Sequence, residues 1–174
     1  MVKCYIMIGI PCSGKTTLAE QMRKNNPNLR IVSSNAVMRD LGLPHDKTSN
    51  QTVFAEVNRR LESLLRKDCD VILDATNLDE KYREEPMKIA RSCDARIIAK
   101  IVSADFQVCE ERNAERIANR VPDDAMQAMY HQFKNTIQNL SGFDDIEVIG
   151  TSGDKFNRLT RRGRVRNDII WGSR

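Results

Sequence analysis

Five short apolar runs lie along the chain, and each has the length and composition of a buried β-strand. They are KCYIMIG at 3–9, LRIVS at 29–33, DVILD at 70–74, ARIIAKIVS at 95–103 and IEVIG at 146–150. Apolar residues fill these runs without a regular polar alternation. This pattern is typical of strands that are covered on both faces of a parallel sheet.

The segments between these runs include one with clear helical spacing. In TVFAEVNRRLESLLRK (52–67), a single helix face would carry Phe54, Val57, Leu61, Leu64 and Leu65. The stretch before it, GLPHDKTSNQ (42–51), is polar and predicts a loop. The alternation of strands and helices predicts an α/β fold of three layers, in which helices flank a parallel sheet.

Length and charge favour one folded domain with a distinct tail. The 174 residues carry a net charge of +4, but from Lys155 onward seven basic residues and one acidic residue give +6, which leaves −2 for the rest. We therefore expect a domain over 1–150 and a basic tail over 151–174. The tail either contacts phosphates, those of nucleic acid above all, or serves as a solubilising terminus.

Cysteine usage and hydropathy indicate the cellular setting. None of the five cysteines has a partner at zinc-ligand spacing, so we expect reduced thiols in a cytoplasmic protein. The longest apolar run, 5–11, is too short to span a membrane, so no membrane association is expected.

The strongest chemical signal follows the first strand. GIPCSGKT (9–16) fits the pattern GxxxxGK[ST] at the start of an expected helix. In such a loop, backbone N–H groups and the helix N-terminus surround phosphates. Lys15 is expected to reach the β- and γ-phosphates, and Thr16 to place its hydroxyl on Mg²⁺. This predicts binding of ATP or another NTP with Mg²⁺ by Gly9, Pro11, Cys12, Ser13, Gly14, Lys15, Thr16 and Thr17.

A second signal lies at the end of the third strand. VILDATN (71–77) places Asp74 at the sheet edge where α/β folds gather their ligands. We interpret Asp74 as a carboxylate that acts on the magnesium ion or its waters; the alternative is a residue that caps a turn. Asn77 is expected to begin the next helix or to contact the acceptor.

A third signal is a series of arginines in EERNAERIANRVPDD (110–124). Arg112, Arg116 and Arg120 are spaced by four, which would stack them along one helix face. Like charges at this spacing repel each other unless an anion joins them. We expect a lid that closes these arginines over the triphosphate, where such groups stabilise the transferring phosphoryl group; a solvated basic face is the alternative.

These blocks, in this order and spacing, resemble the P-loop polynucleotide 5′-hydroxyl kinases of phage and bacterial end-healing systems. The resemblance covers about residues 3–140 and includes GIPCSGKTT, SSN, DATNL, RNAER and VPDDAMQAMY. It implies a P-loop NTPase fold with an arginine-bearing helical lid at about 105–140. It also implies that Arg112 and Arg116 clasp the triphosphate, and that the acceptor is a 5′-OH end of single-stranded RNA or DNA. No DxDGT phosphatase signature is present, so a kinase module alone is expected, in the host cytoplasm if the protein is phage-encoded.

The sequence departs from this family after the second strand, in SSNAVMRD (33–40). The family has an aspartate there that takes the proton of the 5′-OH or orients it, and three residues later an arginine that binds the acceptor phosphate. Asn35 and Met38 occupy these positions. Arg39 becomes the candidate phosphate ligand, since positions three and four residues apart are neighbours on a helix. An amide cannot accept the proton, so Asn35 occupies the position of the general base but cannot act as one.

Three interpretations of Asn35 are open. It is a deliberate Asp→Asn change that traps an acceptor complex, or another carboxylate such as Asp40 acts as the base, or Asn35 only caps a helix in a protein that binds without phosphorylating. The overall alternatives are accordingly a kinase of a small hydroxyl compound and an inactive nucleotide-dependent nucleic-acid-binding module. Candidates for base stacking are Tyr130, Phe133 and Trp171, although core packing also explains the first two.

Overall fold

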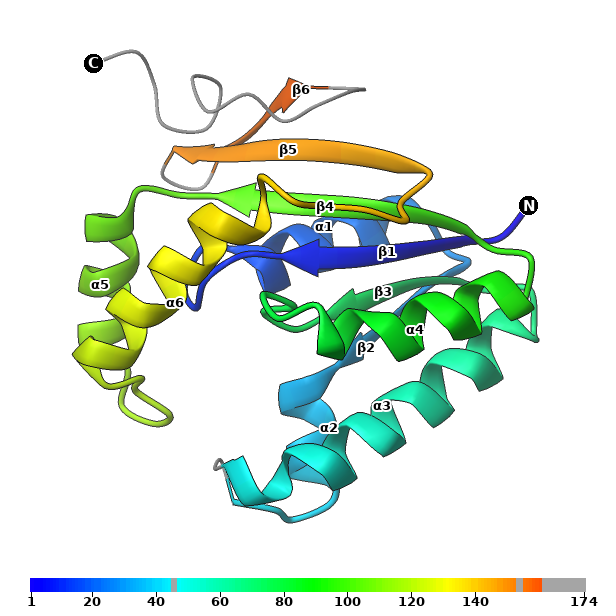
Figure 1. The fold of residues 1–174 in the computed structure, drawn as a ribbon, viewed down its shortest axis with the longest axis horizontal. Helices are drawn as coiled ribbons and strands as arrows, with labels where there is room; N and C mark the ends of the chain where they lie inside the picture. The colour runs from blue at the N-terminus through cyan, green and yellow to red at the C-terminus, as the bar shows by residue number, and fades with distance from the viewer. Residues whose placement is uncertain (45–46, 153–154, 161–174) are drawn as a thin grey trace.

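The computed structural model describes residues 1–44, 47–152 and 155–160 and shows one sheet with helices on both faces (Figure 1). The sheet has six strands in the order β2-β3-β1-β4-β5-β6. The first five are parallel, and β6 pairs antiparallel with β5. The strands are β1 Lys3–Ile8, β2 Leu29–Ser33, β3 Asp70–Asp74, β4 Arg96–Ser103, β5 Asp145–Ser152 and β6 Lys155–Thr160.

Six α-helices and one short 3₁₀ turn connect these strands. The helices are α1 Lys15–Asn25, α2 Ser34–Asp40, α3 Asn50–Leu65, α4 Lys81–Ser92, α5 Phe106–Ala114 and α6 Asp123–Thr136, and the turn is Lys47–Ser49. None of the helices in the described part of the chain combines the length and the apolar character that a membrane crossing requires.

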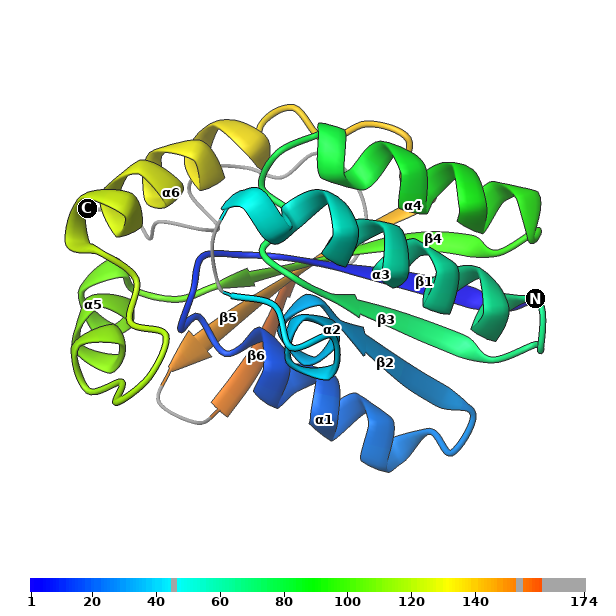
Figure 2. The same cartoon turned by 90° about the horizontal axis from the view of Figure 1, so that it is seen from below.

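The sheet separates two buried clusters, which makes the fold three-layered. The larger cluster lies between the sheet and α3, α4 and α6, which cover the same face in Figure 2. The smaller one packs α1 against the other face through Leu18 and Ala19. Successive residues of β1 alternate between the two, because Ile6 and Ile8 belong to the larger cluster and Met7 to the smaller. This confirms the predicted α/β fold of three layers with five parallel strands.

Two details differ from the sequence-based expectation. The buried stripe of α3 is Val53, Val57, Leu61 and Leu65, whereas Phe54 is only half-buried. Both sets fit helical spacing, and contact with the sheet selects the first. In addition, β6 occupies part of the expected tail, and residues 161–174 lie outside the described residues.

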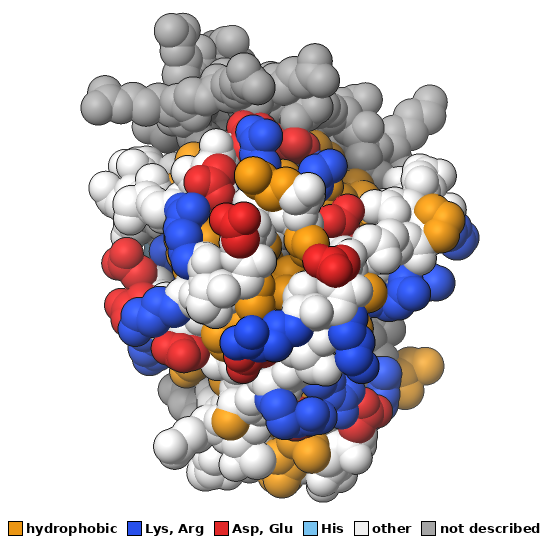
Figure 3. All heavy atoms as spheres, turned by 90° about the vertical axis from the view of Figure 1, so that its right-hand side faces the viewer, with side chains coloured by type: hydrophobic (Ala, Val, Ile, Leu, Met, Phe, Trp, Pro, Cys, Tyr) orange, Lys and Arg blue, Asp and Glu red, His pale blue; other side chains and the backbone are white. Residues whose placement is uncertain are grey.

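Figure 3 shows the end of the molecule at which the parallel strands begin. On this face, acidic and basic side chains are interspersed around a central apolar area (Figure 3). The strands run from it towards α5 and α6 in Figure 1. The carboxyl ends of the strands, where α/β folds bind their ligands, are therefore at the side of these two helices.

Candidate active site

Strand pairing brings the predicted chemical segments together. β1 and β2 both pair with β3, and the β2 register places Ser33 opposite Asp74. The phosphate-binding loop follows β1, α2 follows Ser33, and Asp74 ends β3. Three segments that are far apart in sequence thus leave the sheet side by side at its carboxyl edge.

The loop after β1 has the backbone of a phosphate cradle. A Cβ at Gly9 would approach the Val102 carbonyl oxygen to 2.8 Å, so no larger residue fits there. Cys12 and Gly14 have φ values of 64° and 98°, in the left-handed region. Gly14 is also the N-cap of α1, which directs the helix N-terminus and its free N–H groups into the loop.

Lys15 is a buried cation that the described residues do not neutralise with an ion pair. Its Nζ donates a 2.6 Å hydrogen bond to the Ile10 carbonyl oxygen. Burial lowers the pKa of Lys15 to about 8, although the nearby Asp74 opposes this shift. The Ser13 hydroxyl is also buried and has no hydrogen-bond partner among the described residues. A buried cation and an orphaned hydroxyl in such a loop fit the phosphates of a nucleotide.

Thr16 and Asp74, the two residues expected to bind a metal ion, are in direct contact. The Thr16 hydroxyl donates a 2.8 Å hydrogen bond to Asp74 Oδ2, and the Asp74 side chain is buried. Within the described residues there is no group of three or more His, Cys, Asp or Glu side chains that would hold a metal alone. A single carboxylate and a hydroxyl fit Mg²⁺, which takes few protein ligands and binds largely through nucleotide phosphates and water.

Asn77 connects the strands of the site and does not begin a helix. Its Nδ2 donates a 2.7 Å hydrogen bond to the Met7 carbonyl oxygen, whereas α4 begins only at Lys81. The expectation that Asn77 starts the next helix is therefore wrong. The buried Arg83 donates to the Asn77 carbonyl oxygen at 2.7 Å, and burial lowers its pKa. The bond from Asn77 to Met7 holds the β3–α4 segment against the sheet, and the bond from Arg83 joins that segment to α4.

The arginine segment forms a helix followed by a loop, not one continuous helix. α5 ends at Ala114, so the expected stacking of Arg112, Arg116 and Arg120 on one helix face is wrong. Arg112 donates to the Cys12 carbonyl oxygen at 3.3 Å. Arg112 and Arg116 both line a cavity next to the phosphate-binding loop. Arg120 pairs with Asp123 at 3.1 Å and is not among the lining residues.

A buried asparagine explains this break. Asn113 Nδ2 donates to the Val121 carbonyl oxygen at 2.7 Å, and the Val121 N–H donates to Asn113 Oδ1 at 3.0 Å. These two hydrogen bonds close the segment 114–120 into a loop that carries Arg116. The lid arginines are thus presented by α5 and by a loop fastened to its last turn.

These elements enclose a cavity of about 860 Å³. Its walls come from the phosphate-binding loop, α2, α3, the segment from β3 to α4, and the lid. The described lining residues are Pro11–Thr17, Ser34, Asn35, Met38, Asn50, Val53, Phe54, Asp74–Asp79, Tyr82, Arg112, Arg116, Asn119, Val121, Met129, Gln132 and Thr151.

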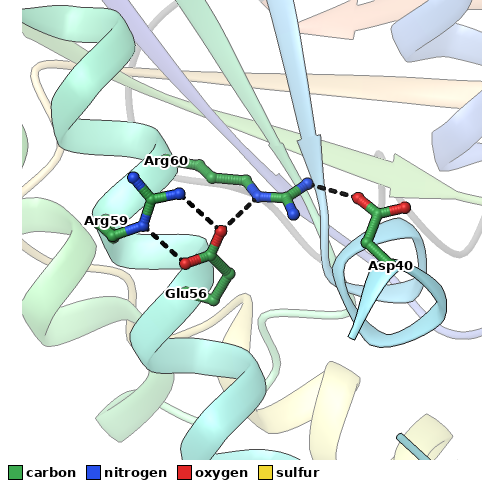
Figure 4. Close-up of polar contacts among 4 residues, drawn as sticks. All are labelled: Asp40, Glu56, Arg59 and Arg60. Carbon is green, nitrogen blue, oxygen red and sulfur yellow. Dashed lines mark hydrogen bonds and ion pairs between the residues drawn. The ribbon is translucent and has the colours of Figure 1, made fainter. Parts of the chain in front are cut away.

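The structure separates the candidates on α2. Asn35 and Met38 line the cavity, while Arg39 is exposed and is not among the lining residues. Asn35 is the second residue of α2 and Ser33 is the N-cap, so the interpretation of Asn35 as a helix cap is wrong. Asp40 pairs with Arg60 of α3 at 2.7 Å outside the cavity (Figure 4). The carboxylates among the described lining residues are Asp74 and Asp79.

Sequence reasoning missed the aromatic side chains of the site. Phe54 and Tyr82 line the cavity, although Phe54 had been expected in the core. Of the stacking candidates, Phe133 is a core residue with 2% exposure, and Tyr130 stacks on Phe106 away from the lining. Trp171 lies outside the described residues.

Several solved structures share this fold at low sequence identity. A chain of the Pnkp1/Rnl/Hen1 RNA repair complex superposes with a TM-score of 0.71 at 19% identity, over 82% of this chain and 47% of that chain. A gluconokinase from Sinorhizobium meliloti 1021 gives a TM-score of 0.57 at 16% identity, over 85% and 82%. These likenesses show a P-loop kinase-like fold.

Sequence comparison adds a curated relative and a family. The chain is 27% identical over 132 residues to the L-seryl-tRNA(Sec) kinase of Methanococcus maripaludis, which covers 74% of this chain and 51% of that protein. The chain thus spans about half the length of this relative. Residues 5–141 match the AAA_33 family, described as an AAA domain. Together with the nucleotide cradle, these findings support a phosphotransferase. Since the match extends over most of the 174 residues, the chain belongs to the AAA_33 family.

Proposed function

We propose that this protein is an ATP- and Mg²⁺-dependent kinase that transfers the γ-phosphate to the 5′-hydroxyl end of a nucleic acid strand. The observation that carries the proposal is the convergence of Lys15, Arg112 and Arg116 with the Thr16–Asp74 pair in one cavity. Asn35 lines that cavity from α2, and it occupies the position that corresponds to the general base of the polynucleotide kinases that the sequence resembles.

Each group has a distinct task in the proposed transfer. Lys15 and the loop amides hold the β- and γ-phosphates, and Arg112 and Arg116 offset the charge on the transferring group. Thr16 and Asp74 hold Mg²⁺, which neutralises phosphate charge when it is bound. The acceptor oxygen forms a bond to the γ-phosphorus, the bond from that phosphorus to the ADP oxygen breaks, and the hydroxyl proton leaves for a base or for solvent.

The names of two similar proteins, which both refer to RNA, support a nucleic acid acceptor. The curated relative is named as a kinase of seryl-tRNA, and one structural neighbour belongs to an RNA repair complex. Either RNA or DNA fits the proposal.

A second candidate is a kinase of a small neutral hydroxyl compound. Met38 lines the cavity where the polynucleotide kinases have a phosphate-binding arginine, and Arg39 is not among the lining residues. A cavity without that cation fits an acceptor that has no phosphate beside its hydroxyl.

The test is transfer of labelled γ-phosphate from ATP to 5′-OH RNA and DNA oligonucleotides, with Mg²⁺ and with a parallel panel of neutral sugars. The polynucleotide kinase is expected to label the oligonucleotides, and Lys15→Met to abolish labelling while the protein remains folded. Transfer to sugars alone would establish the second candidate. ATP binding without transfer to either acceptor class would overturn the phosphotransfer proposal.

A further inference from the structure

A stacked aromatic pair stands in the cavity wall away from the phosphate-binding loop. The rings of Phe54 on α3 and Tyr82 on α4 have centroids 4.6 Å apart and planes inclined by 22°. Both side chains are half-buried and both line the cavity. The two rings therefore present aromatic surface to whatever occupies that part of the cavity.

Core packing does not account for this pair. Neither ring belongs to the two buried clusters of the described residues, or to the partly buried side chains packed against them. α3 already contacts the sheet through its buried stripe, which includes Val53 and Val57. Half-exposed aromatic rings at the wall of a cavity are a usual device for binding a planar ligand group.

The charges around the pair favour a neutral group over a phosphate. The basic side chains among the described lining residues are Lys15, Arg112 and Arg116, all of them on the phosphate-binding loop or the lid. On α3 and the β3–α4 segment, the lining includes Asn50 and Asp79. An amide suits a neutral polar group, whereas a carboxylate repels a phosphate.

Lys81 offsets part of the charge of Asp79 but adds no basic side chain to the described lining. It forms an ion pair with Asp79 at 3.1 Å, and its Nζ lies 4.8 Å from the centroid of the Tyr82 ring. Its side chain is exposed and is not among the lining residues.

We infer that the acceptor carries its hydroxyl on a sugar with a neutral planar base, and that this base stacks on the Phe54–Tyr82 pair. The inference rests on the proposed kinase function and specifies the acceptor. A free nucleoside and the 5′-terminal nucleoside of a strand share this chemistry. Recognition by stacking is tolerant of base identity, because every base has a π-face.

The test measures acceptor binding separately from catalysis. With the donor site saturated by Mg²⁺ and a non-hydrolysable ATP analogue, 2-aminopurine riboside and an oligonucleotide with 5′-terminal 2-aminopurine report stacking through quenched fluorescence. Phe54→Leu is expected to weaken the binding of these probes by about 5- to 150-fold, the typical range for one stacked base. Its affinity for the ATP analogue is expected to change less than twofold.

Phe54→Trp is the matched variant. A ring that binds a base retains its function as Trp, whereas a side chain that only fills space tolerates Leu better than the larger Trp. Thermal melting shows that each variant is folded. The inference would be overturned if Phe54→Trp lost probe binding while Phe54→Leu retained it.

The result separates this inference from the proposed function. If 5′-OH strands are phosphorylated equally well with and without a 5′-terminal base, the kinase stands and the stacking site is overturned. If the probes bind and Phe54→Leu releases them while no acceptor is phosphorylated, the stacking site stands and the kinase is overturned. Quenching by the riboside identifies a free nucleoside as a sufficient ligand, and quenching by the oligonucleotide alone assigns the site to strand ends.

Discussion

At the residue scale, we expect the side chain at position 35 to determine the rate of the proposed transfer. The sheet register places Ser33, the last residue of β2, opposite Asp74. Asn35 follows two residues later on α2 and lines the cavity. Its amide can orient a hydroxyl group but cannot remove the proton. We therefore expect Asn35→Asp to raise kcat for transfer to a 5′-OH end by about 10² or more, the typical contribution of a general base. Steady-state kinetics on both forms measures this change.

Asp79→Asn is the companion variant, because it removes the other carboxylate that lines the cavity besides Asp74. If Asp79 is the base, this change will lower kcat and Asn35→Asp will leave it unchanged. That combination would contradict the assignment of the base to position 35. Asp40, which is held by Arg60 outside the cavity, is not expected to affect either result.

At the scale of elements, the lid depends on the closure of its loop by Asn113. Asn113→Asp keeps the shape but replaces the donor to the Val121 carbonyl oxygen with an acceptor, which leaves two oxygens facing each other. We expect the unfolding free energy to fall by about 1–3 kcal/mol, and kcat by about tenfold to a hundredfold as Arg116 loses its fixed position. Kinetics and hydrogen exchange at the Val121 amide measure the two effects.

The control for this variant is Asn139→Asp, which makes the same chemical change after the end of α6. Within the described residues, the exposed Asn139 side chain donates to the carbonyl oxygen of Asn135 in the last turn of α6. This control is expected to preserve kcat and the exchange rate of Val121. Unchanged kcat in Asn113→Asp would show that another contact positions the loop.

An ion-pair network links α2 to α3 (Figure 4). Glu56 accepts hydrogen bonds from Arg59 and Arg60, and Arg60 also binds Asp40 of α2. The two arginines lower the pKa of Glu56 to about 2. A carboxylate with a lowered pKa stabilises the folded state above its ordinary pKa of about 4.5, and this contribution disappears as the pH falls towards 2.

We therefore expect Glu56→Gln to reduce the unfolding free energy at pH 5 and above, with a difference from the wild type that shrinks to zero near pH 2. Denaturant unfolding across this pH range measures the difference, which will be small for an exposed network. Glu62→Gln is the control, because Glu62 pairs with Arg66 at the C-terminal end of α3 and this pair does not involve α2. A difference that is independent of pH would contradict the network.

At the scale of the whole molecule, the cavity wall formed by the phosphate-binding loop was predictable from the sequence, whereas the aromatic wall formed by α3 and α4 was not. The loop around Lys15 is a contiguous motif at the end of a buried strand, so local sequence specifies its geometry. Phe54 and Tyr82 meet only through the packing of two helices, and helical spacing alone placed Phe54 in the core. The predicted stacking of the lid arginines failed because of another tertiary contact. The hydrogen bonds between Asn113 and Val121 end the helix and form a loop, although the arginines are spaced by four as on a helix face.

Basic side chains occur both in the cavity and in the C-terminal segment 161–174, and this distribution affects how a strand would bind. The described lining of the cavity holds its basic side chains at the phosphate-binding loop and the lid, whereas residues 161–174 contain five arginines and one aspartate. If the terminal base stacks in the cavity, the phosphates further along the strand need contacts elsewhere. The sequence offers this basic segment for them.

We therefore expect removal of residues 161–174 to weaken the binding of a 5′-OH oligonucleotide and to leave nucleoside binding unchanged. Each strand phosphate that the segment neutralises contributes about 0.7 to the slope of log K against log salt concentration, so the slope will fall as well. Binding titrations from low to high salt with both ligands measure this. The control replaces the five arginines by lysine, which keeps the charge and should keep the slope. A truncated protein with the wild-type slope would show that the strand is held entirely by residues 1–160.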